Sequence, residues 1–255
     1  MDFLSNPTAG FVSKRTTPVA GERPTPHAAS SDGTETNYLS ATNPASLRIL
    51  STDTFIFGGW LEKTTGFTGG TIFGKGPGGN ISYTLDYGIN APSKFSIDVQ
   101  KDDLNNSTTV TNNTAVADDT KTFVLCWIDL LTAKIAINAG TAASATHLPL
   151  QTADGGGDLK FFAAASNGFL GIIDNWFFCK NPPDLAAAIT LINSTVYNGG
   201  TGINYSALSE ANKTALGLVS WWAMDEGSTE SRGDSHGANN LTVNGTITQA
   251  TALVA

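Results

Sequence analysis

Short apolar runs separated by clusters of Gly, Asn, Asp and Pro fill residues 38–180 and constrain the fold more than any other feature. We predict β-strands at 53–61, 71–75, 81–87, 94–100, 121–129, 133–138, 158–164 and 169–179. The segments 76–80 (GPGGN) and 154–158 (DGGGD) are two of the separating clusters, and residues of these types form turns. Regular alternation of short strands with turns is typical of an all-β sandwich or jelly roll.

The run 121–129 is predicted to lie in the middle of a sheet. Apolar side chains occupy both of its alternating faces: Phe123, Leu125 and Trp127 on one, and Val124, Cys126 and Ile128 on the other. A strand that is apolar on both faces is covered on both sides.

The two cysteines, Cys126 and Cys179, both lie in strand-like apolar runs. Burial as free thiols is the favoured interpretation, and a disulfide is the alternative. The sequence therefore does not require an oxidising compartment.

The charge of the chain argues against two classes of partner. Its 22 acidic and 14 basic residues give a net charge of −8, and the basic residues are scattered. Phosphate backbones and anionic membranes attract clustered Lys and Arg, so we expect no nucleic-acid and no membrane partner. No apolar run approaches the roughly 18 residues of a membrane helix, and we expect no secretory signal in the first ten residues.

Residues 1–36 differ in composition from the rest of the chain. Four prolines lie among Ser, Thr, Ala and Gly, and apolar periodicity is missing. We predict an extended N-terminal arm over 1–36 and a single sandwich domain over 37–255. An arm of this kind gains order by packing on a neighbouring subunit.

Two short helices and further strands are predicted in the last third of the chain. Pro183 suits a helix start, and apolar residues follow it at helical spacing up to Ile192. A second helix near 206–216 would end at Gly217. Strands are then expected at 218–224 and 239–248.

These pieces together resemble the laminin-G-like, concanavalin-A-like jelly-roll domains found in phage and bacterial surface proteins. The matching segments are 37–40 (NYLS), 45–47 (ASL), 55–60 (FIFGGW), 72–76 (IFGKG), 134–138 (KIAIN), 171–175 (GIIDN) and 191–202 (LINSTVYNGGTG). The resemblance covers about residues 37–250 and implies a concanavalin-A-like β-sandwich.

One segment lies out of the family's order. Residues 217–226 and 234–242 look like the opening strands of such a domain, but they stand at the C-terminal end. The domain is either circularly permuted, or this segment completes a neighbouring copy by strand exchange. We favour permutation within one chain, because unpaired Trp221 and Trp222 would expose a large apolar surface.

Several local motifs are interpreted as turns or strands without chemistry. Residues 233–237 match G-x-S-x-G, but no acidic residue follows the serine and too little chain remains for an acid and then a histidine in the hydrolase order. The RGDS string at 232–235 suits a turn. Residues 69–75 approach a phosphate-binding loop, but Gly76 replaces the hydroxyl residue, and a β-hairpin is expected there.

Calcium is the one metal that the family resemblance implies. The matching positions are Asp174 and Asp225, with Glu226 as a further ligand, and hard oxygen donors suit calcium. The alternative is that these carboxylates accept backbone N–H bonds. No cofactor is required, and a structural calcium is optional.

The combined features favour a non-catalytic virion structural protein, either a capsid decoration protein or another particle-surface protein. Its expected partners are other virion or capsid subunits, contacted through the arm, with a homo-oligomer and surface glycans as further partners. The first alternative is a carbohydrate-binding, lectin-like module of a bacterial or phage surface protein, extracellular or at the cell surface. The second is a glycoside hydrolase of the same architecture, which the adjacent and therefore opposed Asp225 and Glu226 disfavour.

Overall fold

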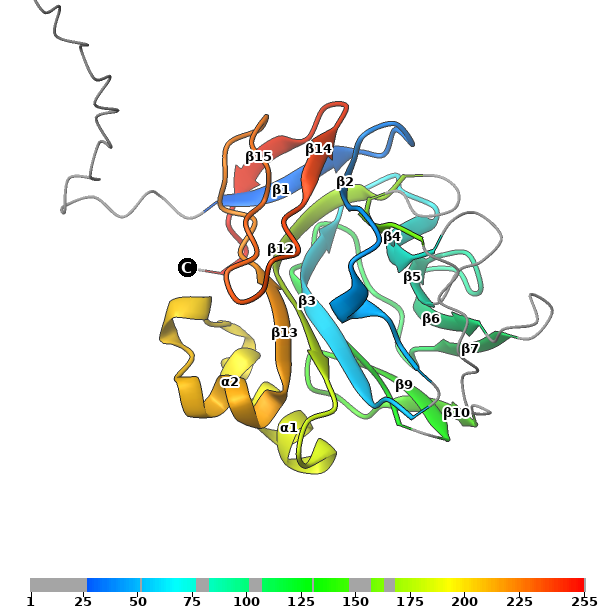
Figure 1. The fold of residues 1–255 in the computed structure, drawn as a ribbon. Coiled ribbons are helices and arrows are strands. Elements are labelled where there is room, and N and C mark those ends of the chain that lie inside the picture. The colour runs from blue at the N-terminus through cyan, green and yellow to red at the C-terminus, as the bar shows by residue number, and fades with distance from the viewer. Residues whose placement is uncertain are drawn as a thin grey trace, which may run out of the picture.

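The computed structural model describes residues 27–50, 52–76, 83–100, 107–129, 131–146, 157–162 and 168–254. These residues form two antiparallel sheets packed face to face, with short helices on one side (Figure 1). The predicted all-β sandwich is therefore confirmed.

The first sheet has eight strands in the order β10-β9-β8-β3-β12-β1-β15, and β13 also pairs with β12. The bounds of its strands are β1 His27–Asp32, β3 Phe55–Lys63, β8 Thr122–Ile128, β9 Thr132–Ile137, β10 Ala143–Thr146, β12 Leu170–Lys180, β13 Leu218–Trp222 and β15 Thr248–Thr251. The second sheet has seven strands in the order β14-β2-β11-β4-β5-β6-β7. The bounds of its strands are β2 Tyr38–Ala41, β4 Gly70–Lys75, β5 Tyr83–Tyr87, β6 Phe95–Gln100, β7 Ser107–Thr111, β11 Leu159–Phe161 and β14 Thr242–Asn244.

An aromatic core fills the space between the two sheets. Alternate residues of the facing strands supply it, because successive side chains of a strand point to opposite faces. Phe57 and Phe178 of the first sheet pack against Tyr83 or Phe73 of the second at ring-centroid distances of 5.1–5.9 Å. Trp176 lies 5.4 Å from Phe73 and is fully buried. Burial of such rings is the main stabilisation of the sandwich.

A second apolar layer covers the outer face of the eight-stranded sheet. Helices α1 (Leu185–Leu191) and α2 (Glu210–Leu216), with a π-helical turn after α1, lie over this face. Their buried residues pack with those of the sheet: Ile56, Trp60, Phe123, Leu125, Phe177, Trp221, Ala188, Ile192, Val196 and Leu216. Strand β8 is accordingly buried on both faces between β9 and β3, as predicted.

The helix boundaries follow capping chemistry. The Asp184 carboxylate accepts a hydrogen bond from the backbone N–H of Ala187, so α1 begins after Asp184 rather than at Pro183. Ser209 caps α2 in the same way, and Gly217 ends it in the left-handed conformation with φ of 59°. The predicted end of the second helix is confirmed.

The C-terminal segment completes its own domain. Strand β13 pairs with β12, β14 pairs with β2, and β15 pairs with β1. Figure 1 shows the orange and red strands of the C-terminal part beside the blue strands of the N-terminal part. Permutation within one chain is therefore the arrangement that the structure contains.

The predicted boundary of the arm at residue 36 is corrected. Residues 27–32, assigned to the arm, form β1 between β12 and β15. The sequence HAASSD lacks large apolar residues, but Ala28 and Ala29 are fully buried, so the sequence pattern did not predict this strand. Residues 1–26 of the predicted arm lie outside the described residues.

Cys126 and Cys179 are both buried and free, as predicted. Burial in apolar surroundings raises the pKa of both thiols, so they pack as small apolar side chains.

Candidate functional site

Asp174, the first residue of the calcium hypothesis, lies fully buried at a bulge in β12. Its Oδ2 accepts hydrogen bonds from the backbone N–H groups of Leu253 and Val254 at 2.7 and 2.9 Å. Its Oδ1 accepts one from Asn175 Nδ2 at 2.8 Å. The carboxyl group of Asp174 thus fastens the end of the chain to the middle of the sheet.

Asp225 and Glu226 also accept backbone hydrogen bonds. Asp225 Oδ1 accepts from His27 N at 3.0 Å, which ties the start of β1 to the segment after β13. Glu226 Oε1 accepts from Gly233 N at 2.5 Å. Burial raises the pKa of Asp174 to about 7, and the negative charge of Asp225 adds to this effect.

These residues do not fit a calcium site. A cation needs free, converging oxygen ligands, whereas both oxygens of Asp174 already accept N–H bonds. In the described part of the chain, no three carboxylate, histidine or cysteine side chains gather where they could hold a metal ion. The alternative interpretation, acceptance of backbone N–H bonds, accounts for the geometry of all three residues.

The turn motifs have the structural roles expected of them. The Arg232 side chain of the RGDS string is fully buried and donates to the carbonyl of Gly227, so the string does not present its arginine at the surface. Asp234 Oδ1 accepts from the N–H groups of Trp221 and Gly237 in a tight turn. The loop-like 69–75 segment is strand β4, hairpin partner of β5.

A polar row crosses the outer face of the seven-stranded sheet. The strand register places its members side by side: Thr242, Ser40, Lys160, Gly74, Thr84, Asp98 and Thr109. Their chain neighbours face the core, so the row faces away from it. Unlike the eight-stranded sheet, this sheet has a polar outer face.

Asp86 lies on β5, two residues after Thr84 of this row, and is buried. Its two oxygens accept from the hydroxyls of Thr71 and Thr84 at 2.7 and 2.9 Å. Burial raises the pKa of Asp86, and the charge of Asp98 adds to it. The two carboxylates are on neighbouring strands but twelve residues apart, which is why the sequence did not reveal them as a pair. Because hydroxyl groups occupy both oxygens of Asp86, its role in the structure is to join β4 and β5.

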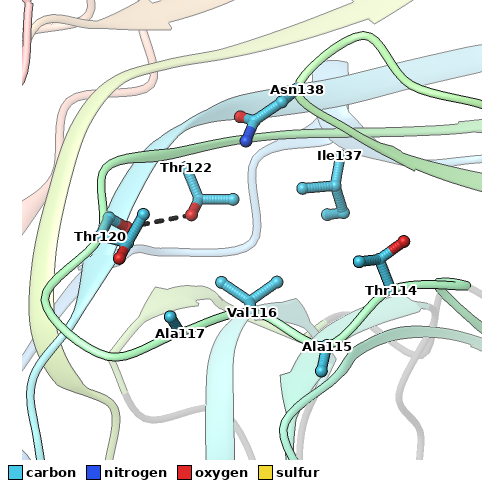
Figure 2. Close-up of a pocket in the computed structure, with 8 residues that line it drawn as sticks. All are labelled: Thr114, Ala115, Val116, Ala117, Thr120, Thr122, Ile137 and Asn138. Atoms are coloured by element: carbon cyan, nitrogen blue, oxygen red, sulfur yellow. Dashed lines mark hydrogen bonds between the residues drawn. The ribbon is translucent and has the colours of Figure 1, made fainter.

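A pocket lies between β9 and the segment that connects β7 to β8 (Figure 2). Its cavity measures about 240 Å³. The lining residues are Thr114, Ala115, Val116, Ala117, Thr120, Thr122, Ile137 and Asn138. Figure 2 shows the side chains of Val116, Ile137 and Thr122 pointing toward one another across the pocket. None of the lining residues carries a charge.

The segment 112–121, which forms one wall, is held in place by several contacts. Lys63, 3% exposed at its side chain, forms an ion pair with Asp118. Asp119 accepts from the N–H and the hydroxyl of Thr65 at 3.0 and 2.6 Å. The carbonyl of Val116 accepts from the Tyr87 hydroxyl, and its N–H donates to Ser93 O. The pocket is therefore formed before any ligand arrives.

The sequence did not reveal this pocket. Its residues are Thr, Ala, Val, Ile and Asn, which occur in any strand or turn. They come from three separate segments, and only the fold brings these together. A turn rich in small and hydroxyl residues, 114–120 (TAVADDT), was the one available signal.

Among the described residues, none of the helices has the length and apolar character needed to cross a membrane.

Comparisons with known proteins bear on the fold. No family model and no curated protein matches this chain. A solved structure of a candidate carbohydrate-binding protein from Bacteroides ovatus matches with a TM-score of 0.59 at 16% identity, over 89% of this chain. This chain spans 60% of the length of that protein.

A heptameric pentraxin from Limulus polyphemus matches with a TM-score of 0.54 at 9% identity, over 91% of this chain and 98% of the pentraxin. The fold is shared with both proteins. Domains LG4-5 of mouse laminin α1 give a TM-score of 0.45 at 14% identity, over 60% of this chain and 40% of theirs. The two matches with TM-scores above 0.5 confirm the predicted jelly-roll sandwich as the fold.

Proposed function

We propose that this chain is a non-catalytic carbohydrate-binding protein, and that the pocket between β9 and the 112–121 segment is its sugar site. The observation that carries the proposal is the lining of this pocket, which combines hydroxyl and amide groups with an apolar floor and contains no charge. Sugars present hydroxyl groups beside apolar C–H patches, and small-molecule sites use a few placed polar groups over apolar surface.

The fold supports this proposal over the virion role. The Bacteroides ovatus protein that shares the sandwich is described as carbohydrate-binding. The virion hypothesis depended on the N-terminal arm, most of which lies outside the described residues. A role in a virion, a location on its surface and capsid partners therefore stay predictions.

A glycan array incubated with the labelled full-length chain tests the proposal. We expect binding to a defined subset of neutral glycans, unchanged by a calcium chelator, because the pocket is built without carboxylates. A filled-pocket variant, Ala117→Leu, should lose this binding while keeping the same melting temperature, since Ala117 is exposed. An array without any bound glycan would refute the proposal. Monitoring the same glycans for cleavage tests the hydrolase alternative.

Loosening the pocket wall should weaken glycan binding without removing any lining atom. Asp119→Ala removes both hydrogen bonds to Thr65, so the 112–121 segment becomes more mobile in the free protein. Ligand binding must then order this segment, and that ordering costs binding free energy. We expect the Kd to rise roughly fivefold, measured by isothermal titration calorimetry. Asp184→Ala, which removes a carboxylate in the helical segment, is the matched control and should leave the Kd unchanged. An equal effect of both variants would contradict the assigned wall.

A further inference from the structure

We infer that the pocket selects the acetamido group of N-acetylated sugars, such as N-acetylglucosamine and N-acetylgalactosamine. This inference rests on the proposed function and names its ligand class. An acetamido group offers three features close together: a methyl group, a carbonyl acceptor and an N–H donor. The pocket presents a complement to each of the three.

Asn138 supplies the donor. Its Oδ1 accepts from Phe123 N at 2.8 Å, and its own backbone N–H donates to Phe123 O at 2.9 Å, so the side chain is fixed at the end of β9. With Oδ1 occupied, the amide nitrogen Nδ2 is the group left to bind a ligand. Figure 2 shows this nitrogen directed toward the space between Thr122 and Ile137. Nδ2 therefore suits a carbonyl oxygen, which only accepts.

The threonines supply acceptors. Thr122 donates its hydroxyl hydrogen to Thr120 O, and Thr120 donates its own to Asp118 O, both at 3.0 Å. Each hydroxyl hydrogen is thus already donated to an acceptor within the protein, while the hydroxyl oxygen keeps lone pairs that can accept a further hydrogen bond. Such oxygens accept a bond from a ligand N–H. Because both hydroxyl hydrogens point to backbone carbonyls, a ligand group that donates, such as an amide N–H, binds here better than a ligand group that accepts.

The floor accommodates the methyl group. Val116, 9% exposed, and the partly buried Ile137 reach the edge of the main core, and Ala115 and Ala117 complete the apolar lining. A plain hexose would place hydroxyl groups against these side chains and leave them without hydrogen bonds, which costs binding free energy. The methyl group instead gains from leaving water.

The size of the pocket and its uncharged lining restrict the class of ligand further. A cavity of about 240 Å³ is smaller than the sites that hold drug-sized ligands, and it suits one substituent or one sugar ring. Since no lining residue is charged, neither a free amine nor a carboxylate finds a counter-charge. Glucosamine, which has an ammonium group in place of the acetamido group, should therefore bind poorly.

The test compares three monosaccharides that differ at one position: N-acetylglucosamine, glucose and glucosamine. Chemical-shift titration of the full-length, ¹⁵N-labelled chain gives each Kd and shows which residues respond. We expect N-acetylglucosamine to bind at least about tenfold more tightly than the other two, the effect of about 1.4 kcal/mol from one hydrogen bond and a buried methyl group. Shifts should centre on residues 114–122 and 137–138.

One variant separates the acetamido contact from sugar binding in general. Asn138→Asp keeps the acceptor for Phe123 N but replaces the donor Nδ2 with an oxygen. Its backbone has φ of 50°, a conformation that this chain already gives to Asp119 at φ of 50°, so the fold should be retained. The preference for N-acetylglucosamine over glucose should fall to within about twofold. Asn244→Asp, on strand β14, is the matched control and should keep the wild-type preference.

The outcomes distinguish this inference from the proposed function. Equal affinity for glucose and N-acetylglucosamine, with shifts at the pocket, would overturn the acetamido inference and leave glycan binding intact. A preference that survives both Asn138→Asp and Ala117→Leu would place the acetamido site elsewhere and also overturn it. Absence of binding to any arrayed glycan would refute the proposed function itself.

Discussion

A chain that ends at Gly217 is expected not to fold. The truncation removes β13, β14 and β15, which pair with β12, β2 and β1 in both sheets. It also removes Trp221 and Trp222, both fully buried. Loss of one large aromatic core residue costs about 3–5 kcal/mol, so losing two together with three strands exceeds the 5–15 kcal/mol that usually stabilises a domain. Far-ultraviolet circular dichroism and limited proteolysis should show an unfolded, protease-sensitive chain.

A rearranged chain provides the control for this truncation. Residues 218–254 placed before residue 27, with a short linker between them, restore all strands in a different order. The linker is feasible because His27 and Thr251 are register partners in β1 and β15. We expect this variant to unfold cooperatively, with a melting temperature within a few degrees of that of the chain 27–254. Cooperative unfolding of the truncated chain would contradict the role assigned to the C-terminal strands.

Asp174→Asn is expected to change how stability depends on pH. Burial raises the pKa of Asp174 to about 7 from its ordinary value of 3.8, so the folded state keeps a proton that the unfolded chain releases. Between about pH 4 and pH 7 the folded state therefore binds more protons, and its stability falls as the pH rises through this window. Above pH 7 the cost of ionising this buried group is fully present.

The variant removes this cost while keeping an acceptor for Leu253 and Val254. The new Nδ2 faces the donor Asn175 Nδ2, which lowers stability by the same amount at every pH. From pH 4 to pH 8 the stability of Asp174→Asn relative to the wild type should rise by on the order of 3 kcal/mol. Urea unfolding at several pH values measures the difference. A constant difference across this range would show that Asp174 does not titrate there.

Asp53→Asn is a control because the pKa of Asp53 is shifted in the opposite direction from that of Asp174. Burial alone would raise the pKa of Asp53, but hydrogen bonds from Lys180, Asn181 and the Leu50 N–H outweigh it and lower the pKa. Asp53 therefore stabilises the fold above the pKa of the unfolded chain, and that contribution is lost as the pH falls through the folded pKa. Asp53→Asn should consequently be less stable than the wild type at neutral pH.

Strands with large apolar residues were predictable from the sequence, and strands built from small or hydroxyl residues were not. The runs 121–129 and 169–179 correspond closely to β8 and β12, because both bury apolar side chains on both faces. Strands β1 (HAASSD), β7 (STTVT) and β10 (ASAT) carry no such pattern. Their pairing partners determine them, and those partners are distant in the chain.

The functional residues were less predictable for a related reason. Aspartates are common metal ligands, but Asp174 and Asp225 instead accept hydrogen bonds from the backbone of residues 253–254 and 27, which are distant in the chain. Asn138 looks like an ordinary turn residue. Its Oδ1 is bonded to Phe123 N, and the fold places the residue beside the 112–121 segment. Together these contacts leave its Nδ2 free to bind a ligand in the pocket.

The pairing of β1 with β15 has a consequence for how the domain can be mounted. Both strands stand at one edge of the eight-stranded sheet, whereas β8 and β9, which border the pocket, lie on the other side of β3 and β12. Whatever is joined before residue 27 therefore leaves from an edge separated from the pocket by the breadth of several strands, about 4.8 Å each. A support attached through the segment before residue 27 would leave the pocket open to ligand, so copies mounted side by side on one support could engage several sugars at once.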